Sequence, residues 1–181
     1  MVTQERKNLK NLNSKKMKTT IYTMLFLVSL SGISFGQLKE GDNLMGGTLG
    51  FWAKNNTPTF GFNYENQVTQ AGVVAIGLGA LLRYSSYPDD RLERYSNLFL
   101  GGQANFNFNQ IASGKFVPFL GVVLGFYSSS PNGNSLKQNG LWAWGQGGMR
   151  YFFSPAVAGV VRFGLGTFNF NALELGVDFK F

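Results

Sequence analysis

Charged and amide side chains recur at alternate positions of this chain, opposite runs of apolar residues. The pattern is clearest in residues 172–181, where apolar side chains at odd positions alternate with Glu174, Gly176, Asp178 and Lys180. Alternate side chains of a β-strand point to opposite faces, so such a segment has one apolar and one polar face. Across the chain, nine candidate site residues fall on the polar face of an expected strand: Glu65, Arg83, Gln103, Gln146, Arg150, Arg162, Glu174, Asp178 and Lys180.

Carboxylate and guanidinium groups in such a pattern can form ion pairs or, in a suitable site, transfer protons. The chain has no histidine and no cysteine, which removes the commonest general base, the commonest metal ligand, thiolate chemistry and disulfides. The adjacent acids Asp89 and Asp90 lie in a charged segment, where we expect a solvated loop pair. We therefore predict structural ion pairing, with no enzymatic activity, no metal and no cofactor.

Basic residues are concentrated near the N-terminus. Residues 1–36 hold six basic residues and one acidic residue, or +5 of the net charge of +7. Lysines at positions 15, 16 and 18 precede the apolar run 21–30, and the small residues Ser34 and Gly36 follow it. These features indicate an N-terminal extension and a cleaved signal peptide over residues 1–36, with Met17 as an alternative start and a membrane anchor as the alternative reading. No basic cluster is interleaved with aromatic residues, so we expect no nucleic-acid partner.

The remaining chain is predicted to be a short polar lead-in, residues 37–43, followed by one β domain, residues 44–181. Segments 85–96 and 128–139 are expected to be polar loops. The fifth strand is apolar on both sides and has no predicted orientation, and Phe99 interrupts the polar face of the fourth. Eight strands are expected from alternation and turn residues: residues 44–53, 59–65, 71–84, 97–108, 115–127, 140–153, 156–167 and 172–181.

Two closed eight-stranded architectures fit this pattern. A soluble ligand-binding barrel hides its apolar face, whereas an outer-membrane barrel exposes that face to lipid and turns the polar face inward. From the second strand onward the apolar face carries no charge, and glycines accompany the charges on the other face, where an eight-stranded lumen barely accommodates side chains. Together with the leader, this favours an all-β fold: an eight-stranded antiparallel up-and-down transmembrane β-barrel in the bacterial outer membrane.

The barrel hypothesis assigns positions to the polar residues. We expect Arg162 and Asp178, on adjacent antiparallel strands, to form an ion pair in the lumen, because buried charges persist mainly when they are paired. Gln103 and Gln146 are expected to complete a polar plug. Aromatic residues near strand ends are expected to form girdles at the membrane interfaces: Tyr64, Tyr84, Tyr151, Phe153, Phe179 and Phe181.

Three segments, residues 118–126, 147–155 and 179–181, carry a resemblance to a known family. Over residues 44–181 the chain resembles the small outer-membrane β-barrel domain proteins of Gram-negative bacteria, akin to the barrels of outer membrane proteins A and X. The resemblance implies contact with outer-membrane lipid and insertion by the outer-membrane assembly machinery, with Phe179 and Phe181 as the C-terminal recognition signal.

The resemblance does not specify a ligand, and three roles stay open. The first is a structural or interaction role, in which segments 85–96 and 128–139 contact an envelope or extracellular partner. The alternative is a porin-like channel for small solutes or ions. A soluble, secreted ligand-binding β-barrel is the second alternative. Conductance separates the first two roles, and fractionation tests the third.

Overall fold

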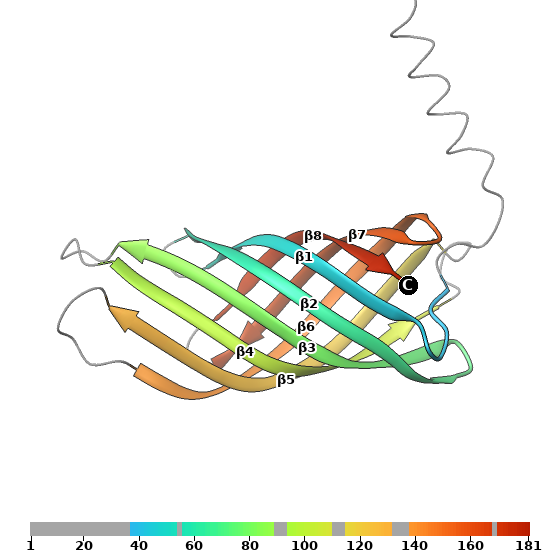
Figure 1. The fold of residues 1–181 in the computed structure, drawn as a ribbon, viewed down its shortest axis with the longest axis horizontal. Coiled ribbons are helices and arrows are strands. Elements are labelled where there is room, and N and C mark those ends of the chain that lie inside the picture. Colours follow the sequence, from blue (N-terminus) through green and yellow to red (C-terminus); the bar gives the residue numbers. More distant parts are fainter. Residues whose placement is uncertain (1–36, 54–55, 89–93, 110–114, 132–137, 168–169) are drawn as a thin grey trace, which may run out of the picture. The chain divides into compact units, whose positions relative to one another are not determined.

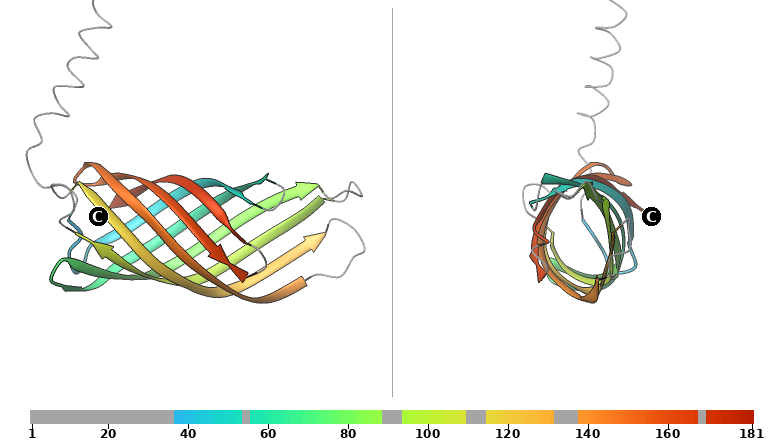
Figure 2. Two further views of the ribbon diagram at one scale, coloured as in Figure 1. Left: turned by 180° about the vertical axis from the view of Figure 1, so that it is seen from behind. Right: turned by 90° about the vertical axis from the view of Figure 1, so that its left-hand side faces the viewer.

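The computed structural model describes residues 37–53, 56–88, 94–109, 115–131, 138–167 and 170–181. The predicted leader, residues 1–36, lies outside the described residues. Each strand pairs antiparallel with the next in sequence, and β8 pairs with β1 to close the barrel (Figures 1 and 2). The strands are β1 Asn43–Trp52, β2 Thr57–Ala71, β3 Val74–Pro88, β4 Arg94–Phe108, β5 Phe116–Pro131, β6 Gln138–Ser154, β7 Val157–Gly166 and β8 Ala172–Lys180.

The strand number and the up-and-down topology confirm the prediction, but β2 is much longer than the expected 59–65. Its polar C-terminal half continues the ladder with β3 up to the pair Ala71 and Val74, with an irregularity between Gln67 and Thr69. Gly72 turns the chain with a φ of +61°, a conformation that glycine adopts without strain. The polar residues after Glu65 are therefore part of the strand and do not form the turn that was expected there.

The prediction that segments 85–96 and 128–139 are loops is wrong at both ends of each segment. Strand β3 continues to Pro88, where it pairs with Arg94 of β4. Strand β5 continues to Pro131 and β6 begins at Gln138. Backbone ladders do not require apolar side chains, so these serine-rich and tyrosine-rich ends remain in the sheet. The middle of each predicted loop, residues 89–93 and 132–137, lies outside the described residues.

The two faces of the wall have opposite character. Large apolar side chains point outward on all eight strands. On β5, for which the sequence predicted no orientation, Leu120 and Phe126 are among the outward side chains. Side chains of the opposite parity, including eight of the nine predicted polar residues, are buried inside. A soluble barrel needs the inverse assignment, so the soluble ligand-binding alternative is wrong for this fold.

The outward apolar belt has the height of a membrane core. On β3 it runs from Val74 to Tyr84. At about 3.3 Å per residue and a tilt of about 40°, that segment spans roughly 25 Å along the barrel axis. Among the described residues no helix is long and apolar enough to cross a membrane.

Both ends of the barrel can be defined from the strand directions. The proximal end is where β1 begins and β8 ends, close to the C-terminus (Figure 1). The distal end is the opposite one, where β3 to β6 reach beyond β1, β7 and β8 (Figure 1).

Candidate functional site in the barrel lumen

An aromatic cluster fills the distal part of the lumen. Phe99 lies at its centre, with ring centroids 4.3 Å from Phe170, 4.8 Å from Tyr127, 5.0 Å from Trp142 and 6.0 Å from Trp52. The buried members of the cluster are Trp52, Leu81, Phe99, Val123, Tyr127, Trp142, Trp144, Phe170 and Ala172. Phe99, which interrupts the predicted polar face of the fourth strand, is thus the core of a distal plug.

Below this plug, Arg83 and Glu174 form a buried ion pair. The Arg83 Nε donates to Glu174 Oε1 at 2.5 Å, and its Nη2 donates to Glu174 Oε2 at 2.8 Å. Thr48 donates to the same carboxylate at 3.3 Å. This two-point contact satisfies both oxygens of Glu174 and holds the guanidinium plane in place.

A second and larger network lies toward the proximal end and is centred on Arg150. Its Nη2 lies 2.7 Å from Glu65 Oε2, and its Nε lies 2.7 Å from Asp178 Oδ2. Its Nη1 donates to Asn107 Oδ1. One guanidinium therefore bridges two carboxylates, which come from the two strands that flank β1.

Amide side chains satisfy the remaining capacity of Glu65. Asn105 donates to its Oε2 and Asn107 to its Oε1, at 2.8 and 2.7 Å. Gln67 also donates to Oε1 at 2.8 Å. These three residues belong to the lumen site, although they are not among the nine predicted site residues. Their parity relative to Glu65 and Gln103 is the signal that would have found them.

The predicted amide pair also forms. Gln146 Nε2 donates to Gln103 Oε1 at 3.0 Å and to Asn105 Oδ1 at 2.7 Å. The pair is thereby joined through Asn105 to the Arg150 network. The part of the prediction that Gln103 and Gln146 complete a polar plug is consistent with these contacts.

The predicted ion pair between Arg162 and Asp178 is wrong. The register places Arg162 opposite Glu174 and Asp178 opposite Ala158, and the Asp178 carboxylate pairs with Arg150. Arg162 Nη1 donates to Asn63 Oδ1 at 2.5 Å, while its Nε and Nη2 have no hydrogen-bond partner among the described residues.

Arg162 is therefore a fully buried cation with no carboxylate within ion-pair distance in the described chain. It has cationic neighbours instead. Arg83 donates to the same Asn63 oxygen at 2.8 Å. Arg150 and Arg162 both lie over the Phe119 ring, 4.4 and 5.5 Å from its centroid.

Lys180 differs from the other eight predicted residues because it is only partly buried. Its Nζ lies 3.4 Å from Asp42 Oδ2 and 3.3 Å from the Gln37 carbonyl oxygen. It thus contacts the segment that precedes β1 at the proximal mouth, and among the described residues it has no hydrogen bond or ion pair with the lumen network.

That segment, the predicted polar lead-in 37–43, also contributes to the core. Leu38 is 0% exposed and packs in an apolar cluster with Leu44, Ala75, Val117, Phe152 and Ala158. Its amide N–H donates to Asn109 Oδ1 at 3.0 Å, and Asn109 Nδ2 donates back to the Leu38 carbonyl at 2.8 Å. A proximal cap of this kind was missed, because one leucine in a short polar segment has no periodicity to reveal it.

Inward-facing glycines make room for these large side chains. A methyl group at Gly77 would lie 2.6 Å from Glu65 Cδ, and one at Gly148 would lie 2.6 Å from the Phe119 ring. A methyl group at Gly164 would overlap the Trp144 indole. The glycines of the polar face are therefore part of the packing of the site, in agreement with the narrow lumen expected for eight strands.

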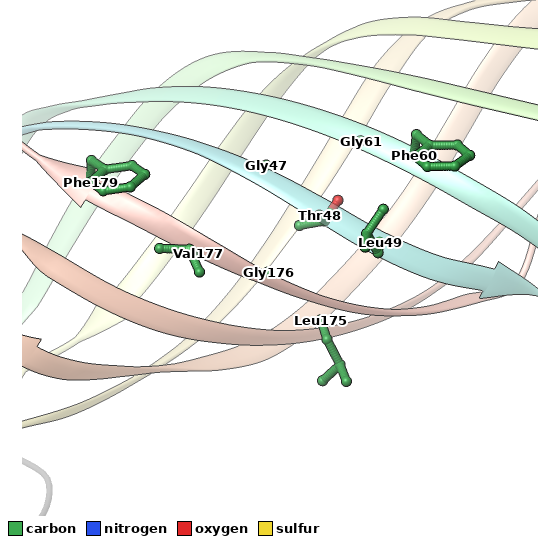
Figure 3. Close-up of a pocket in the computed structure, with 9 residues that line it drawn as sticks. All are labelled: Gly47, Thr48, Leu49, Phe60, Gly61, Leu175, Gly176, Val177 and Phe179. Carbon is green, nitrogen blue, oxygen red and sulfur yellow. The ribbon is translucent and has the colours of Figure 1, made fainter.

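The outer wall carries a shallow depression across β8, β1 and β2 (Figure 3). It has a volume of about 490 Å³, and Gly47, Gly61 and Gly176 lie on it without side chains. Leu49, Leu175 and Phe179 border it (Figure 3). Its lining is almost wholly apolar and faces outward, so it belongs to the lipid-facing surface and not to the lumen site.

The aromatic residues expected at the interfaces also lie on the outer wall. Tyr64, Tyr84, Phe153, Phe179 and Phe181 are exposed there, and Tyr151 is half-buried. Two of the hydroxyl groups meet polar partners: Tyr64 donates to Asn43 Oδ1 at 2.8 Å, and the Tyr84 hydroxyl lies 3.3 Å from Ser96 Oγ.

Chemically, the lumen site is a neutral, closely packed assembly. It holds equal numbers of buried arginines and carboxylates: Arg83, Arg150 and Arg162, and Glu65, Glu174 and Asp178. Within the described chain, no group of three or more acidic residues is placed to hold a metal ion. The arrangement is suited to holding the barrel wall together from inside.

The sequence matches no protein-family model and no curated protein sequence. The structure is similar to the N-terminal β-barrel domain of OprF from Pseudomonas aeruginosa, with 16% identity, a TM-score of 0.53, and coverage of 80% of this chain and 100% of that one. It is similar to Neisserial surface protein A (NspA), with 13% identity, a TM-score of 0.53 and coverage of 80% and 100%. It is also similar to outer membrane protein OprG from P. aeruginosa, with 11% identity, a TM-score of 0.55 and coverage of 81% and 99%. At these identities the similarity shows the fold, which is that of the small eight-stranded outer-membrane barrels.

Proposed function

We propose that this chain is an outer-membrane β-barrel that does not conduct solutes and acts as a membrane-embedded scaffold, contacting partners through its distal strand ends. The observation that carries the proposal is the filled lumen. The distal aromatic cluster, the two arginine networks and the Leu38 cap occupy successive levels of the barrel. Side chains in such packed, hydrogen-bonded layers leave no continuous aqueous path.

Placement in the outer membrane rests on three features. The outer wall is an apolar belt of membrane height, the fold is shared with bacterial outer-membrane proteins, and the leader has the features of an export signal. On this proposal the proximal end faces the periplasm, and residues 1–36 are removed before Gln37.

Assembly follows from the same placement. Phe179 and Phe181 are exposed on the outer wall at the end of the closing strand, where β8 completes the barrel by pairing with β1. Before β8 pairs with β1, its edge and its outward side chains would be accessible to the outer-membrane assembly machinery. We therefore propose that Phe179 and Phe181 serve as the C-terminal signal for this machinery.

No catalytic role is proposed. The chain has no histidine, and the carboxylates of the lumen are buried against guanidinium groups. The distal strand ends are the part of the barrel that would face away from the periplasm, where an extracellular partner could bind. The proposed interaction therefore involves the distal ends of β3 to β6, which reach beyond β1, β7 and β8.

Single-channel recording in planar bilayers tests the proposal. We expect no conductance steps for the folded protein. A matched pair of variants controls the assay: Phe99→Ala opens the centre of the distal plug, whereas Phe126→Ala changes a lipid-facing ring on the neighbouring strand. Regular conductance steps from the unmodified protein would contradict the scaffold proposal and favour the porin-like alternative.

A further inference from the structure

The guanidinium of Arg162 has an open hydrogen-bonding edge inside the barrel. The residue lies in the middle of β7, opposite Glu174 of β8, and is 0% exposed. Its Nη1 donates to Asn63 Oδ1, and its guanidinium carbon lies over the Phe119 ring, 5.5 Å from the centroid. These two contacts hold the group in place. Its Nε and Nη2 have no hydrogen-bond partner in the part of the chain that the structure describes.

The same edge binds carboxylates in the other two lumen arginines. The Nε and Nη2 of Arg83 donate to the two oxygens of Glu174. The Nε and Nη2 of Arg150 donate to two further carboxylates, one each. On a planar guanidinium these two N–H groups point in the same direction, so together they bind an anion from one side. Arg162 therefore presents, without a partner, the edge that binds an anion in its two neighbours.

The side chain of Asn63 provides a further buried donor beside this group. Its Oδ1 accepts from both Arg162 and Arg83, which fixes which end of the amide carries the oxygen. Its Nδ2 then has no partner within the described chain. Buried N–H groups in native proteins almost always have an acceptor. Several unpaired donors around one contact therefore indicate an acceptor that the described residues do not supply.

The charge around Arg162 points to an anion. Its cationic neighbours are Arg83, which shares the oxygen of Asn63, and Arg150, which shares the ring of Phe119. Arg150 pairs with two of the three buried carboxylates and Arg83 with the third. Although the lumen holds equal numbers of both charges, Arg162 has none of the carboxylates within ion-pair distance. Buried charges persist mainly when they are paired, and a counter-ion would supply the missing charge.

We propose that the Nε and Nη2 edge of Arg162 binds a small monovalent anion, of the size of chloride, inside the barrel. The distal aromatic cluster and the Leu38 cap close the lumen on either side of this level. A packed eight-stranded lumen leaves room only for a compact ion, which would enter while the barrel forms. The inference goes beyond the proposed scaffold role and does not depend on it.

Water is the alternative occupant. Asp178 Oδ1 and Gln146 Oε1 are buried acceptors without a partner among the described residues. A water molecule could connect one of them to Arg162, because buried waters commonly join polar groups that lack a direct partner. Such a water would satisfy the N–H groups and add no charge. An anion and a water respond differently to an exchange of salt, and this difference is the basis of the test.

Urea-dependent folding into lipid vesicles, in sodium chloride and in sodium gluconate, is the first measurement. Both salts are used at an ionic strength of about 0.15 M, so that general screening is the same. Gluconate serves as an anion too large for the packed lumen. Chloride at about twice its dissociation constant should raise the folding equilibrium constant roughly threefold, which moves the urea midpoint upward by about 0.3 M. Equal midpoints in the two salts would overturn the proposal.

Three variants test whether this response belongs to Arg162. Arg162→Met removes the edge and should abolish the shift between the salts, whereas Val161→Ala changes the neighbouring outward-facing residue and should retain it. Asn63→Asp places a carboxylate against Arg162 and should raise the midpoint in gluconate while removing the response to chloride. A shift that persists in Arg162→Met would mean that chloride acts elsewhere, which would overturn the assignment.

A crystal structure of the unmodified protein, folded and crystallised in sodium bromide, locates the ion directly. The expected result is an anomalous scattering peak at the Nε and Nη2 edge of Arg162. Water density at that edge without an anomalous peak would overturn the proposal. This result decides the question even if a variant fails to fold. Conductance is a separate measurement, since an open channel would overturn the scaffold proposal and leave the bromide result standing.

Discussion

Arg150 and Arg162 are both fully buried in the lumen, but they differ in their partners. This difference predicts that the same substitution destabilises the protein far more at position 150 than at position 162. Arg150 pairs with Glu65 and Asp178 at 2.7 Å each. Within the described chain, Arg162 makes one hydrogen bond, to the neutral side chain of Asn63. Methionine is a suitable replacement in both cases, because it keeps much of the stem and removes the charge.

Arg150→Met would leave two carboxylates buried without their common counter-charge. Breaking a buried ion pair by removing one partner costs about 3–5 kcal/mol of unfolding free energy, and two carboxylates place the expectation at the upper end, about 5 kcal/mol. Arg162→Met removes a cation that lies beside two other arginines. Asn63 Oδ1 keeps its bond from Arg83, so the expected cost is at most about 1 kcal/mol.

Urea-dependent folding into lipid vesicles measures both values, with the heat-modifiable band on a detergent gel as an independent count of folded molecules. Arg150→Lys serves as the control that keeps the charge and loses the planar contacts, and it should fall between the two methionine variants. If Arg162→Met lowered the free energy of unfolding as much as Arg150→Met, the conclusion that Arg150 and not Arg162 pairs with the lumen carboxylates would be refuted.

Two further predictions concern packing at either end of the lumen. Gly164→Ala places a methyl group against the Trp144 indole and should lower the free energy of unfolding by roughly 1–3 kcal/mol. The control Gly145→Ala places its methyl group outward, 3.9 Å from the nearest atom, and should lower it little. Equal losses of unfolding free energy in urea titrations would argue against the proposed role of glycine in the packing. Leu38→Ala leaves a cavity in the proximal cap and should lower the free energy of unfolding by about 2–5 kcal/mol. The control Lys39→Ala removes an exposed side chain and should leave this free energy nearly unchanged. The same urea titrations measure both variants, and an unaffected Leu38 variant would mean that the cap does not stabilise the barrel.

The number of strands and the direction of each face could be predicted from the sequence because a lipid-facing wall imposes a strict period of two. Parity alone places Arg83, Arg150 and Glu174 inside, and the structure confirms this. Parity would also have placed Trp142 and Trp144 inside. Their apolar character drew no attention, since a lumen was expected to be polar.

The partners inside the lumen could not be predicted in the same way. Pairing depends on the stagger between strands and on how far a side chain reaches across the barrel. Arg150 on β6 reaches Glu65 on β2 and Asp178 on β8, although none of these strands is adjacent to β6. Strand ends were misjudged for a related reason, because the polar side chains at positions 85–87 and 94–96 and the proline at position 88 gave no sign that their backbones stay paired.

Tryptophan quenching by brominated lipid tests the central claim most directly, namely that the apolar face meets lipid and the other face fills a closed lumen. All three tryptophans, Trp52, Trp142 and Trp144, are buried inside the barrel. In vesicles with brominated acyl chains, their fluorescence should be nearly unquenched, while a Leu124→Trp variant should add an emission component that is strongly quenched. Strong quenching of the three native tryptophans, or none at position 124, would contradict the assignment of the two faces.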